Sequence, residues 1–237
     1  MFRYFCFLAL FWNVKSATAP FITPCKNGDT ACVQASATAL MPLLARGIPE
    51  FGMKPLDPLK VPRITSEQGS LKITMTDTEL TGLKDCKIET LKHDRIKGKQ
   101  VLVLRCDMSL EGDYVLDGQL LILPVQGKGR YKIDIRDIVI KILTDLTSEQ
   151  GPDGKEHWKV VKWRESFQVK TGVKFHFDNL FNGNKALADP VLEFANTSWK
   201  DVMQEIAPPI IHTIIAAVFE EFKALYKAVP AEELYIP

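Results

Sequence analysis

The segment 198-SWKDVMQEIAPPIIHTIIAAVFEEFKALYK-227 is the most informative about the fold, because it is long, helical in its spacing and apolar on more than one face. One apolar stripe recurs at intervals of three and four residues, as in an amphipathic helix. Its members include Met203, Ile206, Ile210, Ile214 and Val218. The other faces of residues 210–219 are also apolar, which is typical of a helix buried on several sides. At 1.5 Å per residue the helix would be about 45 Å long, with a kink at Pro208-Pro209.

The residues before this segment alternate between apolar and polar with a period of two, which predicts strands. The clearest runs are 71–76, 102–110, 131–135 and 173–177. Glycines at Gly98, Gly112, Gly127, Gly129, Gly151, Gly154 and Gly172 are interpreted as turns between them. Strands joined by short turns form an antiparallel meander. Because a flat sheet covers only one side of a helix, we predict an α+β fold in which a highly curved antiparallel sheet wraps the long C-terminal helix.

The N-terminus has the pattern of a secretory signal peptide, with a cationic start, the apolar run 5–12 and small residues at Ser16, Ala17 and Ala19. We therefore assign residues 1–19 to a signal peptide and residues 20–237 to a single domain. Helical spacing from Asp29 or Thr30 to Gly47 predicts a first helix. No later stretch reaches about 18 uninterrupted apolar residues, so we expect a secreted, extracellular protein without stable membrane insertion.

Four cysteines remain after signal removal, an even number suited to disulfides in an oxidising compartment: Cys25, Cys32, Cys86 and Cys106. Their spacings do not match a metal site. Turn residues 96–99 lie midway between Cys86 and Cys106, and a hairpin pairing Ile88 with Leu104 would oppose the two thiols. Two buried free thiols are the alternative. Asn196-Thr197-Ser198 is a sequon for N-glycosylation at Asn196.

The sequence shows no sign of catalysis or nucleic-acid binding. The formal net charge is +1, which supplies no field for phosphates. Nucleophile elbows, zinc-protease motifs, Walker loops and dinucleotide fingerprints are all missing from the sequence, and its four histidines are scattered. We expect no enzyme activity, no cofactor and no metal. The apolar residues alone favour a packed core over a cavity, since composition does not show a pocket.

Several short motifs, in order over some 200 residues, resemble the takeout and juvenile-hormone-binding family. They include Pro24-Cys25 with Cys32, 47-GIPE-50, 56-LDPL-59, 118-GQLLILPVQGKG-129, 177-FDNLFNG-183 and 196-NTSW-199. The resemblance implies a tubular lipid-binding fold and a carrier that holds a hydrophobic small molecule in a tunnel between helix and sheet. It also implies a Cys25–Cys32 disulfide that anchors the N-terminal segment.

The same resemblance implies the residues of the site. The helix stripe would form one wall, with Phe175 and Phe177 opposite, and the Tyr131 hydroxyl would meet the polar end of the ligand. The hormone-binding branch has a second disulfide near the C-terminus, whereas this chain has no cysteine after Cys106. The takeout branch is therefore the better match. The expected partner is a juvenile-hormone-like terpenoid, a fatty acid or another long apolar molecule, with an unidentified receptor left open.

Two other functions stay open at this point. One is a membrane-surface lipid-binding defence protein of the bactericidal type, which would need a cationic tip that the near-neutral charge does not favour. The other is an unrecognised esterase that uses the tunnel, which a screen of aryl and fatty esters would separate from a carrier.

Overall fold

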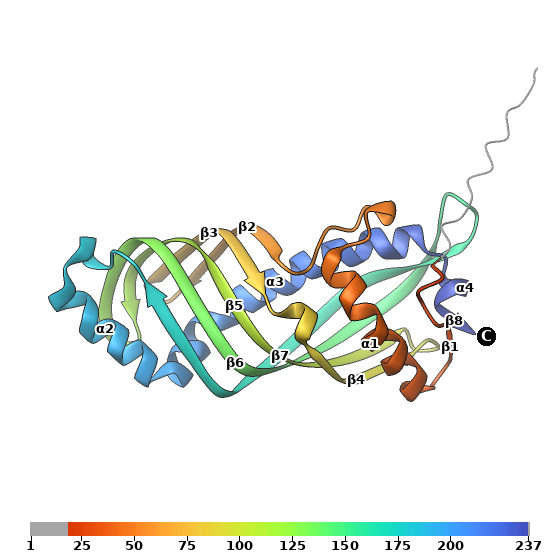
Figure 1. Ribbon diagram of the computed structural model, residues 1–237, viewed down its shortest axis with the longest axis horizontal. Coiled ribbons are helices and arrows are strands. Elements are labelled where there is room, and N and C mark those ends of the chain that lie inside the picture. Colours follow the sequence, from red (N-terminus) through yellow and green to blue (C-terminus); the bar gives the residue numbers. More distant parts are fainter. Residues whose placement is uncertain (1–18, 237) are drawn as a thin grey trace, which may run out of the picture.

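The computed structural model describes residues 19–236, so the signal peptide predicted for residues 1–19 lies almost wholly outside the described residues. In this range the chain forms an elongated body, in which a strongly curled sheet wraps a long C-terminal helix (Figure 1). The predicted fold class is confirmed.

The sheet has six strands, in the antiparallel order β2-β3-β5-β6-β7, and β4 pairs with the first half of β5. Their bounds are β2 Leu59–Gln68, β3 Leu71–Thr81, β4 Lys87–Asp94, β5 Lys99–Leu120, β6 Leu123–Gln150 and β7 Glu156–Phe177. β6 has 28 residues, which would extend about 90 Å if it were straight. The C-terminal helix that it covers is about half that length, so the strand must run diagonally around the helix.

β-bulges bend the long strands and increase the twist that this path requires. The strand registers shift at Asp77 in β3, at Asp107 in β5 and at Asp137 in β6. Asp77 and Asp137 have positive φ angles of 50° and 58°, a conformation that aspartate tolerates better than most residues. The Asp137 carboxylate accepts two 2.6 Å hydrogen bonds from Arg105, and the Asp137 N–H donates to Asp107 at 2.7 Å. These contacts fix the bend on the outer surface.

The C-terminal helix α3 spans Trp199–Ala228 and runs along the concave face of the sheet (Figure 1). It is uninterrupted across Pro208 and Pro209, where the sequence predicted a kink, and the Thr213 hydroxyl donates to the Pro209 carbonyl at 2.9 Å. By length and composition α3 is the only helix in residues 19–236 that could cross a membrane. Its apolar face is instead packed against the sheet, as expected of a core helix.

Shorter helices accompany α3, namely α1 Thr30–Arg46, α2 Lys185–Thr197 and α4 Ala231–Leu234. α1 is the predicted first helix, and its N-cap residue Asp29 accepts the Cys32 N–H at 3.0 Å. α2 and strand β2 were not predicted. Pro62 lies within β2, and β2 is at the edge of the sheet, where a missing N–H is tolerated.

The prediction that the glycines lie in turns between strands is partly wrong. Gly112, Gly127, Gly129 and Gly172 lie inside strands, and the hairpin between β5 and β6 turns at Leu121-Ile122. A Cβ atom at Gly112 would lie 2.7 Å from the Thr76 carbonyl oxygen, and one at Gly129 would lie 2.6 Å from that of Asp178. These glycines therefore allow close backbone approach rather than chain reversal.

Both cysteine pairs are bridged, Cys25 to Cys32 and Cys86 to Cys106, with Cα atoms 5.8 and 4.5 Å apart. In the β4–β5 hairpin Ile88 lies opposite Leu104, as the sequence predicted. The alternative of two buried free thiols is excluded in this structure.

Candidate functional site

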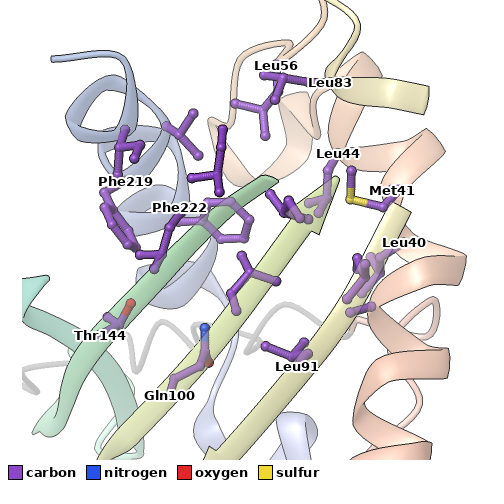
Figure 2. Close-up of a pocket in the computed structure, with 18 of the residues that line it drawn as sticks. Leu40, Met41, Leu44, Leu56, Leu83, Leu91, Gln100, Thr144, Phe219 and Phe222 are labelled. Carbon is purple, nitrogen blue, oxygen red and sulfur yellow. The ribbon is translucent and has the colours of Figure 1, made fainter. Parts of the chain in front are cut away.

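A cavity of about 310 Å³ lies between α3, the inner face of the sheet and α1, and its walls are almost entirely apolar (Figure 2). This volume is within the range of known small-molecule sites. From the helix the wall includes Met203, Ile206, Ile210, Ile214, Val218 and Phe222. From the sheet it includes Leu102, Ile133, Ile135, Ile140, Ile142 and Phe175. Each of these strands contributes alternate residues, which point inward, while most of the residues between them point outward and are polar.

α1 forms the third wall and was missed as part of the site. Its contribution includes Val33, Leu40, Met41 and Leu44, of which the last three project toward the cavity in Figure 2. The Cys25–Cys32 bridge ties the start of α1 to β1, Cys25–Lys26, and the Gln34 amide donates to the Ile88 carbonyl at 2.9 Å. The apolar spacing of residues 33–44 predicted a helix with one buried face, but nothing in that spacing showed what the face covers.

Six of the eight residues predicted to bind ligand are brought together on the cavity wall. They are Phe175, Met203, Ile206, Ile210, Ile214 and Val218. Phe175 is only 3% exposed, and it comes from β7, across the cavity from the helix residues. Their part in binding a ligand remains a prediction.

Tyr131 and Phe177 do not line this cavity. The Tyr131 hydroxyl donates to the Thr78 hydroxyl at 2.8 Å inside the core, and burial raises the pKa of Tyr131 to about 12. Phe177 packs edge-on against Tyr114 and stacks on Tyr131, with ring centroids 4.8 and 6.0 Å apart. Tyr131 therefore has a partner of its own and is a core tyrosine here.

Polar side chains reach the cavity mainly at the end formed by the β4–β5 hairpin and the chain termini. His93, Gln100, Thr144 and Tyr226 are all on the lining there. Burial raises the pKa of Tyr226 to about 12 and lowers that of His93 below its usual 6.5, so both side chains are uncharged at neutral pH. No sequence motif marks these residues, because they come from three strands and a helix.

Among the described residues, the site holds no arrangement that would do acid–base, nucleophilic or metal chemistry. No three His, Cys, Asp or Glu side chains converge anywhere in residues 19–236. A buried histidine–carboxylate pair outside the cavity is structural, since His157 contacts Asp153 Oδ1 at 3.0 Å and the Tyr226 carbonyl at 2.9 Å. It ties the β6–β7 hairpin to the end of α3.

The predicted glycosylation residue, Asn196, has a different role in the structure. Its side-chain amide accepts the Phe175 N–H at 2.8 Å and donates to the carbonyls of Phe175 and Leu192 at 3.1 and 2.8 Å. Both amide hydrogens of Asn196 are therefore used, and a glycan on this nitrogen would replace one of them.

A curled antiparallel sheet around a long helix, with an apolar cavity between them, defines the class of tubular lipid-binding folds. The family model described as "Haemolymph juvenile hormone binding protein (JHBP)" matches residues 5–236. The chain therefore belongs to this family, whose members are hydrophobic-ligand carriers rather than enzymes.

Known relatives agree with this assignment. The circadian clock-controlled protein daywake of Drosophila melanogaster is 28% identical over 225 residues, covering 89% of this chain and 85% of that protein. A putative beta-carotene-binding protein of Schistocerca gregaria is 20% identical and covers 86% of this chain and 82% of its own length. The crystal structure of Takeout 1 from Epiphyas postvittana superimposes with a TM-score of 0.87 at 29% identity, covering 91% of this chain and all of that one. The resemblance to the takeout branch is confirmed.

Proposed function

We propose that this protein is a secreted carrier that encloses one long apolar small molecule in the cavity between α3, the sheet and α1. The observation that carries the proposal is the cavity itself, whose three walls are apolar and come from elements far apart in the sequence. A packed core would have filled this space, because protein interiors leave few voids larger than a water molecule.

Energetics are compatible with tight binding by apolar contact alone. Burying about 400 Å² of apolar ligand surface is worth roughly 10 kcal/mol before the costs of association. The family is named for juvenile hormone and one relative for beta-carotene, and both compounds are apolar small molecules. Secretion is supported by the N-terminal signal pattern and by two disulfides, which persist in oxidising compartments.

The other two candidate functions have less support. A membrane-surface binder would need a cationic patch, and the chain has 30 basic against 29 acidic residues. An esterase would need a nucleophile and a base at the cavity, and the cavity histidine, His93, has no such partner within residues 19–236.

Substitution of Ile210 by tryptophan tests the carrier function. Ile210 is 6% exposed overall and faces the cavity, so an indole there would occupy the space that a ligand uses. We expect displacement of a fluorescent apolar probe from the delipidated protein to show at least tenfold weaker binding, with an unchanged melting temperature. Glu220→Trp, on the exposed side of α3, is the matched control and should bind the probe normally.

Two results would count against the carrier. A melting temperature that drops with Ile210→Trp while probe binding holds would show a packed core, since overpacking costs about 1–3 kcal/mol. Failure of the delipidated wild-type protein to bind any long apolar compound would remove the function altogether.

A further inference from the structure

We propose that His93, Gln100 and Thr144 form a polar subsite inside the apolar cavity, which holds an uncharged oxygen-bearing group of the ligand, such as an ester, ketone, ether or alcohol. The subsite would give an elongated ligand a fixed direction. This inference rests on the proposed carrier function and specifies the chemistry of its ligand.

The three residues lie side by side because of the strand register. His93 in β4 pairs with Gln100 in β5, Gln100 pairs with Thr144 in β6, and Thr144 pairs with Trp163 in β7. Directly opposed residues project from the same face of a sheet. Together these four residues form one transverse row, called the polar row here. The first three are on the cavity wall, and Figure 2 shows Gln100 and Thr144 directed into the cavity.

The polar row is unsatisfied within the described part of the protein. Both ring nitrogens of His93 and the indole nitrogen of Trp163 are buried and have no hydrogen-bond partner there. Thr144 is only 2% exposed and Gln100 is half-buried, and in the same part of the chain neither side chain has a hydrogen-bond partner. An unpaired buried polar group is unfavourable, and native proteins rarely keep several of them together. A ligand in the cavity would supply partners to the three residues on its wall, His93, Gln100 and Thr144, whereas Trp163 does not line it.

The neighbouring row shows that polarity here is a local feature. Two residues further along each strand, on the same face, lie Leu91, Leu102 and Ile142. All three line the same cavity. The polar row is thus one polar band next to a wall of aliphatic side chains, the arrangement that fixes the orientation of a mostly apolar ligand.

The side chains of the polar row are uncharged, which indicates that the ligand group they bind is also uncharged. Burial holds the pKa of His93 below its usual value, so its imidazole is neutral and offers one donor and one acceptor. Gln100 and Thr144 likewise offer donors and acceptors without charge. Arg95 also reaches the cavity lining, but its guanidinium lies 3.9 Å from the centre of the Tyr235 ring and close to Glu156. A carboxylate would therefore find no fully buried cation in the polar row.

The direction of the ligand follows from the position of the row. His93 packs on Trp158 with ring centroids 4.6 Å apart, and Trp158 packs on Tyr226 near the end of α3 at 5.9 Å. Met203 is 23 residues earlier than Tyr226 on the same helix, about 35 Å away. The polar group would lie at the end near the chain termini, and the apolar tail would extend toward Met203, Ile206 and Phe175.

Compounds of equal chain length that differ at one end provide the test. Hexadecane, 1-hexadecanol, methyl hexadecanoate and hexadecanoate would displace N-phenyl-1-naphthylamine from the delipidated full-length protein. We expect hexadecanol and the methyl ester to bind about tenfold tighter than hexadecane, the factor given by one such hydrogen bond (about 1.4 kcal/mol).

The triple variant His93→Phe/Gln100→Met/Thr144→Val keeps the side-chain volumes and removes the hydrogen bonding. It should bind hexadecane at least as well as wild type and lose the preference for the oxygenated compounds. Retained hexadecane binding shows that the variant is folded, and the single Thr144→Val change offers a milder version. Gln126→Met/Thr147→Val, which makes two of these three exchanges at exposed positions of β6, is the control and should keep the preference.

The outcomes separate the subsite from the carrier function. Equal binding of hexadecane and hexadecanol by wild type, or an undiminished preference in the triple variant, would overturn the subsite and leave the carrier intact. A preference for hexadecanoate that disappears in Arg95→Gln would overturn the uncharged group. Failure of wild type to bind the probe or any of the four compounds would overturn both.

Discussion

Gly127 lies near the start of β6, close to Tyr114 and Leu180. A Cβ atom at Gly127 would come within 2.8 Å of the Tyr114 hydroxyl and 3.0 Å of the Leu180 Cα atom. The Tyr114 hydroxyl is fixed by a 2.6 Å hydrogen bond to the Asp178 carbonyl, so it cannot yield without loss. We expect Gly127→Ala to lower the free energy of unfolding by about 1–3 kcal/mol in denaturant titrations.

Gly172 in β7 provides the matched comparison. Within the described residues, no atom lies within 4 Å of the position that an alanine methyl group would take there, and the φ angle of Gly172 is one that alanine adopts. Gly172→Ala should therefore leave stability unchanged or raise it slightly, because alanine restricts the unfolded chain. Equal losses of unfolding free energy in the two variants would show that the effect of the substitution comes from strand propensity and not from the close approach of other atoms to Gly127.

His93 predicts a pH dependence. Burial, assisted by Arg95 and opposed by Asp94, lowers the His93 pKa from 6.5, so the unfolded chain binds the proton more tightly than the folded protein. The contribution of neutral His93 to the free energy of unfolding is fully present above pH 6.5. It is lost as the pH falls from 6.5 through the lower pKa that His93 has in the folded protein. Denaturant titrations from about pH 7.5 to about pH 5.5 should show wild type losing stability relative to His93→Phe. A constant difference between the two proteins would mean that His93 titrates as it does in water.

At the scale of elements, Asn196 is the contact that holds α2 against β7. Its amide pairs with the N–H and C=O of Phe175, as a neighbouring strand would, while Ile133 of β6 pairs with Phe175 on the other side. Asn196→Ala would leave both backbone groups without these partners, and we expect a loss of about 1–3 kcal/mol in unfolding free energy.

We expect the same contact to disfavour glycosylation of Asn196 in the folded protein. The protein secreted from eukaryotic cells should show an unmodified Asn196 in peptide mass spectra. Ser198→Ala removes the sequon but keeps the asparagine, and within the described chain the Ser198 side chain makes no capping hydrogen bond, so the stability of this variant should match wild type. A glycan found on Asn196 of folded protein would contradict the proposed contact.

The elements that could be predicted are those whose own residues repeat a pattern. α1 and α3 have helical spacing, and the four predicted strand cores alternate, because each has one face on the core. The lengths of β5, β6 and β7 could not be predicted, since glycines that read as turns are required by contacts with other strands. The residues of the helix wall of the cavity could be predicted, because they form one apolar stripe on α3. The α1 wall and the polar row depend on strand register and on packing between distant segments, and no local pattern contains that information.

At the scale of the whole molecule, the cavity joins the helix, the sheet and α1, so a ligand in it contacts all three. A compound that binds only the folded protein stabilises it by about 2.7 kcal/mol at 100 times its dissociation constant. For a chain of this size this corresponds to a rise in melting temperature of about 5–10 °C. We expect that rise with methyl hexadecanoate in differential scanning fluorimetry, and a smaller one in Ile210→Trp. An unchanged melting temperature at saturating ligand would contradict binding within the core.

The pairing of β1, Cys25–Lys26, with β8, Tyr235–Ile236, has a practical consequence for purification. This parallel pair is only two residues long, yet Cys25, Lys26 and Tyr235 all line the cavity, so β1 and β8 together form part of its wall. Chain ends are where folds fray first. We expect an affinity tag fused to the C-terminus to strain the β1–β8 pair, so preparations that differ only in the placement of the tag should retain different amounts of bound apolar compound.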